Sequence, residues 1–202
     1  MPRHFNTAGP VIPAKHYCID PLQRMDWDEI HSLIAAEKFF VLHAPRQTGK
    51  TSTLLAIMDA LNRAGNYTAL YFNVESGQSA RGDVAAAMPA ILGSLVEGAA
   101  ARLRDPRLRT WWPEIWAQHG PHAALKTLLS RWAQENHLPI VLLIDEVDAL
   151  VGDTLISLLR QLREGYIGRP GVPFVQSVIL CGVRDVRDYR MHTAQHEIIT
   201  GG

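Results

Sequence analysis

The residues with the clearest chemical potential lie between positions 39 and 52. This segment reads FFVLHAPRQTGKTS, an apolar run that enters a turn ending in Gly49, Lys50 and Thr51. Where a strand enters a helix through a tight loop, main-chain N–H groups converge on one point and the helix dipole adds positive potential, so an anion is stabilised there. Gly49 lets the main chain approach, Lys50 can reach the β- and γ-phosphates of a nucleotide, and the Thr51 hydroxyl can bind Mg²⁺. The segment therefore predicts a nucleotide phosphate site.

One position departs from the usual pattern of such a loop, G-x-x-x-x-G-K-S/T. Ala44 stands where the first glycine is expected, and alanine does not easily take the positive φ that glycine allows. We expect the departure to be tolerated, either because the loop starts in an ordinary conformation or because Pro45 rigidifies a different start. The predicted nucleotide-binding residues are Ala44, Pro45, Arg46, Gln47, Thr48, Gly49, Lys50, Thr51 and Ser52.

Two carboxylates, Asp145 and Glu146, directly follow the apolar run VLLI at residues 141–144. A carboxylate at the end of a buried strand is costly unless it is paired or meets a metal, so we expect Asp145 to act with Mg²⁺, directly or through a hydrogen bond. Glu146 points differently and is predicted to polarise an attacking water as general base. The alternative for Glu146 is an ion pair or the cap of the next turn, where Asp148 could also serve.

Alternating strands and helices must position these residues. The pattern predicts strands at 39–43, 68–74, 140–144 and 174–183. It predicts helices from Asp26, at 50–64, at 82–104 with a kink or break at Pro89, at 121–135, and from a cap at Asp153 to Gly165. Such alternation indicates βαβ crossovers, hence an α/β fold: a three-layer α/β/α sandwich with a mainly parallel sheet. Ligands of such sheets bind beyond the carboxyl ends of the strands, where the loop and the carboxylates fall.

The composition limits compartment and partners. The chain has 202 residues, 47% of them apolar, with no signal-peptide pattern or membrane span at its start and only two cysteines, which predicts a cytoplasmic globular protein. Basic and acidic residues balance at 20 each, so nucleic acid is not indicated as a partner. The arginines at 102, 104, 107 and 109, next to three tryptophans, are expected to form a solvated helix end followed by packed aromatics. The nine histidines form no zinc-site pattern.

Residues 44–51 and 141–146 together resemble the Walker A and Walker B motifs of the ASCE class of phosphate-loop ATPases, which includes AAA+ and STAND proteins. The resemblance implies the P-loop NTPase fold with ATP and Mg²⁺ as cofactors. It implies that Lys50 neutralises the β/γ-phosphate oxygens. It also implies that Thr51 and Asp145 hold the metal and that Glu146 orients the attacking water. The fourth strand leads into Arg184, as it often does in STAND proteins, where a guanidinium would stabilise charge on the transferring phosphoryl group. A salt bridge with Asp185 or Asp188 is the alternative for Arg184.

Other positions resemble the family less sharply. Leu22-Gln23-Arg24 is similar to an element near the adenine, so Tyr17 and Arg24 could touch base or ribose, although an arm packed on the sheet would also explain them. Asn73 falls where many AAA+ proteins hold a polar switch residue, and a strand-end Asn is equally typical of a turn. Arg160 and Arg163 share one helix face; they could enter a neighbour's site in a ring or remain an exposed cationic face.

The predicted organisation is an N-terminal arm at 1–24 and an ATPase core at 25–202 that stops short of a helical lid, as a fragment or truncated product would. The predicted function is Mg²⁺-dependent binding and hydrolysis of ATP, with ATP and ADP as ligands and a protein partner or homo-oligomer as further possibilities. Two alternatives stay open: a switch or scaffold that binds ATP with little turnover, and a phosphotransferase. The missing Asn-Lys-x-Asp tetrad favours adenine over guanine.

Overall fold

A four-stranded, all-parallel sheet forms the centre of the protein. The structure is a computed structural model that describes residues 4–6, 12, 14–45 and 47–182. The strands lie in the order β1-β4-β3-β2. Their bounds are Phe39–His43 for β1, Thr68–Asn73 for β2, Ile140–Asp145 for β3 and Ser177–Gly182 for β4. All four predicted strands are present; β2 and β4 are shorter than expected, and Val183, the last residue of the predicted fourth strand, lies outside the described residues.

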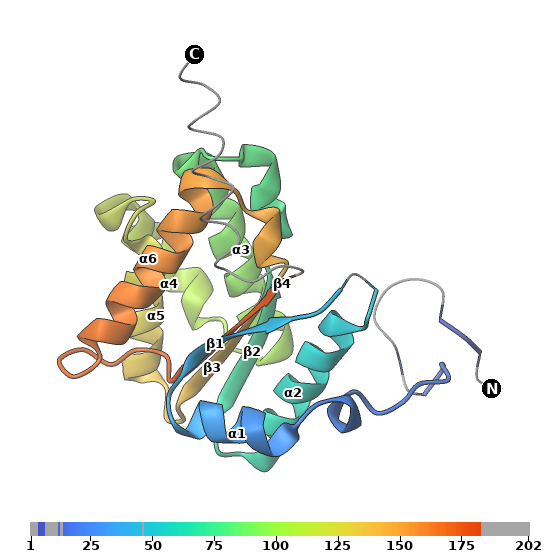
Figure 1. Cartoon of the computed structure of the whole chain (residues 1–202). Helices are drawn as coiled ribbons and strands as arrows, with labels where there is room; N and C mark the ends of the chain where they lie inside the picture. Colours follow the sequence, from blue (N-terminus) through green and yellow to red (C-terminus); the bar gives the residue numbers. More distant parts are fainter. Residues whose placement is uncertain (1–3, 7–11, 13, 46, 183–202) are drawn as a thin grey trace.

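Helices cover both faces of the sheet, as Figure 1 shows. On one face lie α1 (Trp27–Ala35) and α2 (Lys50–Ala64), whose buried residues share a core with Ala69, Tyr71, Val141 and Leu143. The other face carries α3 (Val84–Arg102), α4 (Arg107–His119), α5 (Ala124–Glu135) and α6 (Gly152–Gly168). The predicted three-layer α/β/α sandwich is therefore confirmed.

Strand β3 shows why the sheet is buried on both sides. All six of its residues are buried. Alternate side chains enter the two cores: Val141 and Leu143 pack towards α2, while Leu142 and Ile144 pack towards α3 and α6. This is the double coverage that a continuous apolar run predicts for a parallel strand.

The predicted helix at 50–64 matches α2 at both ends. Gly49 before it and Gly65 after it both adopt left-handed conformations, with φ of 86° and 74°. A glycine in this conformation ends a helix at little steric cost. Helix α1 is capped as predicted, because the Asp26 carboxylate accepts a hydrogen bond from the Glu29 N–H at 3.0 Å.

Helix α3 runs unbroken from Val84 to Arg102, so of the kink or break predicted at Pro89 the break is wrong. The loss of one N–H donor at Pro89 is offset by burial, since Met88, Ile91 and Leu95 are fully enclosed in the core. Among the described residues, α3 alone is long and apolar enough to cross a membrane. However, 44% of its apolar 18-residue stretch is buried inside the protein. It is the core helix of this domain.

Helix α4 was not predicted. Pro106, Pro113 and a dense set of arginines conceal its periodicity, yet Trp111 and Ile115 are buried. The expectation that the aromatics of this segment pack on the domain is confirmed.

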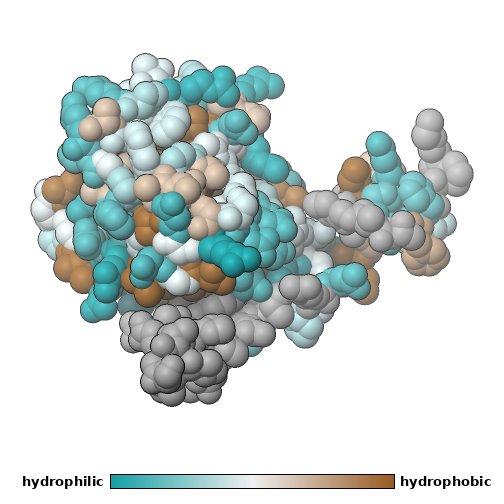
Figure 2. All heavy atoms as spheres, turned by 90° about the horizontal axis from the view of Figure 1, so that it is seen from above, coloured by the Kyte–Doolittle hydropathy of each residue, from teal (hydrophilic) through white to brown (hydrophobic). Residues whose placement is uncertain are grey.

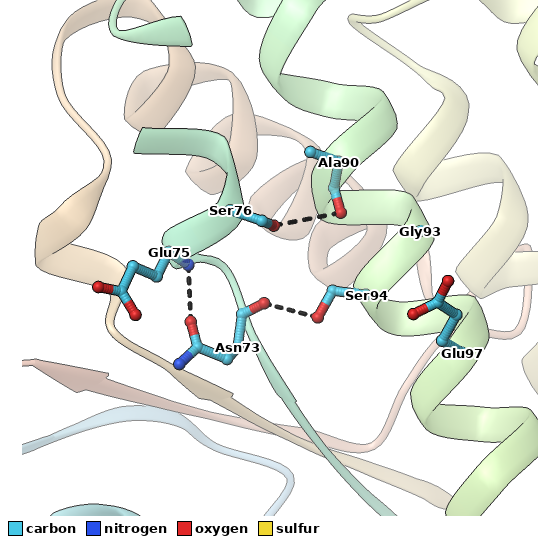
Figure 3. A pocket seen from close by; sticks show the side chains of 7 residues that line it. All are labelled: Asn73, Glu75, Ser76, Ala90, Gly93, Ser94 and Glu97. Carbon is cyan, nitrogen blue, oxygen red and sulfur yellow. Dashed lines mark hydrogen bonds between the residues drawn. The ribbon is translucent and has the colours of Figure 1, made fainter. Parts of the chain in front are cut away.

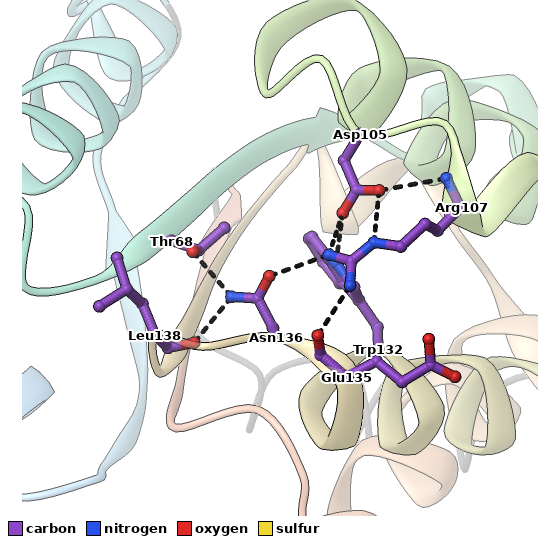
Figure 4. A network of polar contacts seen from close by, with 7 residues as sticks. All are labelled: Thr68, Asp105, Arg107, Trp132, Glu135, Asn136 and Leu138. Atoms are coloured by element: carbon purple, nitrogen blue, oxygen red, sulfur yellow. Dashed lines mark hydrogen bonds and ion pairs between the residues drawn. The ribbon is translucent and has the colours of Figure 1, made fainter.

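A polar network fixes the start of α4 to the end of α5, as Figure 4 shows. Arg107 pairs with Asp105 at 2.7 Å and donates to the Glu135 carbonyl and the Asn136 side chain. The Trp132 indole donates to the same Asp105 carboxylate at 2.9 Å. These hydrogen bonds, led by that of Arg107, hold the pKa of Asp105 below its usual value. Arg107, one of the arginines in the basic stretch at 102–109, therefore has a structural role.

Helices α5 and α6 start differently from the prediction. Helix α5 begins at Ala124 instead of residue 121, because the buried side chain of Gln161 accepts hydrogen bonds from the N–H groups of Leu125 and Lys126. Helix α6 begins at Gly152 with Val151 at its N-cap, so Asp153 lies in the first turn and is not the cap. The capping prediction for Asp153 is wrong.

The N-terminal arm extends away from the body of the protein (Figures 1 and 2). His4 and His16 form an isolated parallel bridge, and the rings of Phe5 and Tyr17 lie 5.2 Å apart. Tyr17 is 55% exposed. The arm reaches the body at the short helix η1 (Pro21–Arg24).

Candidate functional site

Two described residues of the loop between β1 and α2 have left-handed main-chain conformations. Positive φ values fall on Gln47 (59°) and Gly49 (86°) but not on Ala44, so the loop starts in an ordinary conformation and tolerates alanine there, as expected. The Thr48 hydroxyl donates to the Pro45 carbonyl at 2.8 Å and closes the turn. A Cβ atom on Gly49 would lie 3.1 Å from a guanidinium nitrogen of Arg24, so a larger residue at this position would be strained by its φ and crowded.

Lys50 lies at the first position of α2 and reaches back across the loop. Its ammonium donates to the carbonyl oxygens of Ala44 at 3.0 Å and Pro45 at 3.1 Å. A lysine in this position carries its charge beside the converging N–H groups of the helix start, which is the arrangement that anions favour. Ser52 follows in the first turn of α2.

Asp145 is the polar centre of the site and is completely buried. Its Oδ2 atom accepts a hydrogen bond of 2.7 Å from the Thr51 hydroxyl, 94 positions away in the sequence. The same oxygen accepts from the Tyr71 hydroxyl at 3.1 Å, and Oδ1 accepts from the Glu146 N–H at 3.0 Å. The structure thus brings together the two residues predicted to hold Mg²⁺, because β3 ends beside the start of α2.

Glu146 lies directly after β3 in a left-handed conformation, with φ of 56° and ψ of 39°. Non-glycine residues adopt this region at a cost of about 1 kcal/mol, and such strain is typical of functional positions. Burial raises the pKa of its carboxyl group above the ordinary glutamate value, and the charges of Asp145 and Asp148 raise it further, while Lys50 acts in the opposite direction. A carboxyl group with a raised pKa is better suited to accept a proton from water.

Sequence reasoning missed two side chains next to Asp145. Tyr71 donates to it from β2, and the buried Cys181 lies on β4, where the Asp145 charge influences its thiol. Burial is the main reason that the pKa values of Tyr71 and Cys181 are both raised, and the Asp145 charge adds to it. Both groups therefore remain protonated, and Tyr71 is a hydrogen-bond donor to Asp145. The sequence signal for Tyr71 is limited to a polar-tipped residue inside an apolar strand, because its pairing with β3 is known only from the structure.

A cavity of about 220 Å³ lies beside the loop, where η1 approaches α2. Arg24 and Met25 form one side of it, and Leu42, Thr48 and Lys50 lie on the loop side. Arg24, predicted as a possible contact to base or ribose, therefore lines a hollow next to the loop. Tyr17 is exposed and contacts Phe5.

Asn73 ends β2 and lies opposite Asp145 in the strand register. Figure 3 shows it at the edge of a larger cavity of about 630 Å³. Its side chain accepts from the Glu75 N–H at 2.7 Å, and its carbonyl accepts from the Ser94 hydroxyl at 2.6 Å. These contacts give Asn73 the turn-forming role that was one of its two interpretations.

The remaining candidate residues lie apart from this cluster or outside the described part. Arg46 and Arg184 are outside the described residues. Arg160 and Arg163 are exposed on α6.

The residues of the site suit Mg²⁺, which phosphate and water also bind. They do not suit a metal ion that is bound entirely by protein side chains. Within the described residues, no group of three or more His, Cys, Asp or Glu side chains could hold a metal ion. Mg²⁺ is usually bound through one or two protein oxygens together with phosphate oxygens and water. The Thr51 hydroxyl and the Asp145 carboxylate supply such oxygens, so the donor set is suitable.

Comparison with known proteins agrees with this geometry. A family model described as an AAA domain matches residues 34–189. No match was found among curated protein sequences.

Two solved structures are similar to the chain. One is a chain in the structure of Drosophila ORC bound to poly(dA/dT) DNA and Cdc6, with a TM-score of 0.52 and 12% identity over 86% of this chain and 26% of that chain. The other is a chain in a structure of Drosophila ORC bound to DNA, with a TM-score of 0.39 and 18% identity over 76% of this chain and 36% of that chain. The chain thus spans about a quarter to a third of the lengths of these two chains. At such low identity, the first similarity shows the fold alone.

Proposed function

Because this chain belongs to the AAA domain family and is an ATP-binding P-loop domain of the ASCE class, we propose that it hydrolyses ATP with the help of Mg²⁺. The observation that carries the proposal is the hydrogen bond of 2.7 Å between Thr51 on α2 and Asp145 on β3. It joins the phosphate loop to the acidic strand end at one point. Glu146 lies next to that point, where a water molecule would attack.

In the proposed reaction, Lys50 leaves the carbonyl oxygens of its own loop and neutralises the β- and γ-phosphate oxygens. Thr51 and Asp145 would hold Mg²⁺, which would supply positive charge to the phosphate oxygens. The main-chain N–H groups before α2 orient the phosphates. Arg184, as predicted, would stabilise charge on the transferring phosphoryl group.

Glu146 is the proposed base. Its main chain is left-handed, and the Asp145 carboxylate is already bound by Thr51 and Tyr71, so we assign the two adjacent acids to different partners. The carboxylate would accept the proton of the attacking water as the oxygen bonds to the γ-phosphorus and the bond to ADP breaks.

Two substitutions test these roles. Lys50→Ala is expected to lower ATP affinity at least tenfold, because a charge beside the phosphates is lost. Glu146→Gln is expected to keep ATP affinity and to lose hydrolysis by at least a hundredfold. Titration calorimetry with Mg²⁺-ATP, followed by a phosphate-release assay on the same preparation, measures both.

Matched controls remove the same groups elsewhere. Lys126→Ala removes a lysine that pairs with Glu164 at 2.9 Å on the other face of the sheet, and Glu114→Gln changes an exposed glutamate on α4. Neither should alter binding or turnover. Equal loss of ATP binding in Lys50→Ala and Glu146→Gln would contradict the roles assigned to them.

The same assays separate the two alternative functions. Tight binding with no turnover, unchanged by Glu146→Gln, would identify a switch or scaffold. Phosphate recovered on an added small molecule or protein, instead of free in solution, would identify a phosphotransferase.

We further propose a cytoplasmic protein that acts through protein partners or its own copies and not through nucleic acid. The similar ORC chain belongs to a complex that contains DNA, but here the charges balance and Arg107 is already paired with Asp105. A gel-shift assay with duplex DNA in the presence of ATP is expected to show no complex; a stable, salt-sensitive complex would reverse this proposal.

A further inference from the structure

Tyr71 makes a contact that the proposed reaction has not yet used. Its hydroxyl donates to Oδ2 of Asp145, the same oxygen that accepts from Thr51. Oδ1 accepts from the main chain of Glu146. Asp145 is thus held from α2, from β2 and from its own strand end.

The position of Tyr71 is itself fixed by packing. It pairs with Leu143 in the parallel register of β2 and β3, two residues before the pair of Asn73 with Asp145. Only 8% of Tyr71 is exposed, and the Arg102 guanidinium lies 5.1 Å from the centre of its ring. A phenol clamped in this way presents its hydroxyl in one direction.

A buried carboxylate needs such partners for two reasons. Each unpaired oxygen in an apolar interior costs free energy. A carboxylate that can rotate also presents its lone pairs to a metal less reliably than one that hydrogen bonds hold in place. Without Tyr71, each carboxylate oxygen would keep a single hydrogen bond, Oδ2 from Thr51 and Oδ1 from the Glu146 N–H. The Tyr71 hydroxyl adds a second hydrogen bond to Oδ2 from the β2 side and narrows the range of carboxylate orientations.

We propose that Tyr71 is a positioning residue for magnesium: its hydroxyl orients the Asp145 carboxylate, so that the site binds Mg²⁺-nucleotide better than nucleotide alone. The inference rests on the proposed Mg²⁺-dependent function and deepens it, because it assigns the metal dependence partly to a residue outside both motifs. Tyr71 touches neither nucleotide nor metal in this account. It acts through Asp145.

The test measures metal dependence separately from nucleotide affinity. A fluorescent ATP analogue is titrated by anisotropy in EDTA, and its binding is then followed as Mg²⁺ is added. Tyr71→Phe, which removes only the hydroxyl, is expected to raise the Mg²⁺ concentration for half-maximal binding by about tenfold, the lower end of the range for residues that orient metal ligands. Affinity in EDTA should stay within about twofold of wild type.

Tyr166→Phe is the matched control. It removes the same group from a ring that packs on Phe39 at 4.8 Å, away from the loop, and should change neither quantity. A purely structural role for Tyr71 would weaken binding equally with and without metal, and that result overturns the inference.

Other outcomes separate this inference from the proposed function. If wild-type protein binds ATP equally well with and without Mg²⁺, the Mg²⁺-dependent function fails and the role of Tyr71 fails with it. If wild type shows metal dependence and Tyr71→Phe matches it, the role of Tyr71 alone is wrong.

A second measurement does not depend on the folding of the variant. In wild-type protein labelled with ¹³C at the tyrosine Cζ atoms, the Tyr71 resonance reports the hydrogen bond of its hydroxyl. It is expected to shift when Mg²⁺ is added to the nucleotide complex and to stay in place when nucleotide is added in EDTA. An unchanged resonance in both steps would overturn the inference.

Discussion

At the residue scale, Glu146 combines a strained main chain with a carboxyl group whose pKa is raised. Neither property stabilises the fold. A glycine would adopt the same φ of 56° without strain, yet the chain places a glutamate there. Such a compromise is expected where the side chain has a chemical role.

Replacing Glu146 with glycine should therefore stabilise the protein while it removes activity. We expect Glu146→Gly to raise the free energy of unfolding by about 1 kcal/mol relative to Glu146→Ala, because alanine keeps the strain that glycine relieves. Urea unfolding measures this difference, and phosphate release should be lost in both variants.

Glu37 provides the control for that comparison. It also has a positive φ, 58°, but it follows α1 away from Asp145. Glu37→Gly should gain similar stability relative to Glu37→Ala and keep its turnover. A loss of stability in Glu146→Gly would show that the left-handed conformation carries no strain.

The raised pKa of Glu146 predicts how hydrolysis varies with pH. A general base works when it is deprotonated, so the rate should fall as the pH falls through the Glu146 pKa, which lies above the ordinary value of 4.5. A profile of kcat/KM for phosphate release, measured at Mg²⁺-ATP concentrations well below KM, reports the free protein and should show this acid limb at a pH above the glutamate range. Hydrolysis that stays constant down to pH 4 would argue against Glu146 as the base.

At the element scale, the side chain of Gln161 links two helices. From α6 it accepts from two N–H groups at the start of α5 and donates to the Pro121 carbonyl at 3.0 Å. Gln161 is 1% exposed, so water cannot replace these hydrogen bonds. It takes the place of a local cap, which α5 does not have.

Gln161→Ala should therefore destabilise the protein by about 2–4 kcal/mol, the combined effect of a lost helix cap and unpaired buried groups. Denaturant unfolding measures the change. Gln118→Ala, on the exposed face of α4, removes the same side chain with an expected change within about 0.5 kcal/mol. A similar small change at both positions would mean that α5 does not need this cap.

The elements differ in how well the sequence predicts them. Strand β1 and helix α2 matched the prediction because a sharp apolar run and two glycines mark their ends in the local sequence. Helix α4 and the start of α5 did not, because contacts from distant residues decide them: Trp132 and Glu135 anchor the start of the first, and Gln161 caps the second. The local spacing of apolar residues cannot indicate such partners, because they lie far away in the sequence.

The contacts of the candidate site also differ in how well the sequence predicts them. The Thr51 to Asp145 contact followed from the rule that ligands meet the carboxyl ends of parallel strands. The Tyr71 contact required the strand order, in which β2 neighbours β3. The assignments of Arg46 and Arg184 stay predictions, because both residues lie outside the described structure.

At the scale of the whole molecule, the two faces of the sheet have different tasks. The face under α1 and α2 carries the phosphate loop, Tyr71 and Cys181, while the face under α3 to α6 contains most of the large apolar side chains. A ligand that binds only the native state stabilises the whole cooperative fold, so nucleotide bound at the loop before α2 should also stabilise the core on the other face.

This coupling predicts a thermal shift. Mg²⁺-ATP at about 100 times its dissociation constant should stabilise the native state by about 2.7 kcal/mol, which for a domain of this size raises the melting temperature by about 5–10 °C. Differential scanning fluorimetry measures it. Lys126→Ala should show the same shift and Lys50→Ala a much smaller one; a full shift in Lys50→Ala would place the nucleotide elsewhere.

The most direct test of the central claim is a crystal structure of the protein with Mg²⁺ and a non-hydrolysable ATP analogue. The account predicts the γ-phosphate against Lys50, the metal between that phosphate and the Thr51 hydroxyl, and Asp145 still hydrogen-bonded to both Thr51 and Tyr71. An analogue bound away from the loop, or a metal held without Thr51 and Asp145, would contradict it.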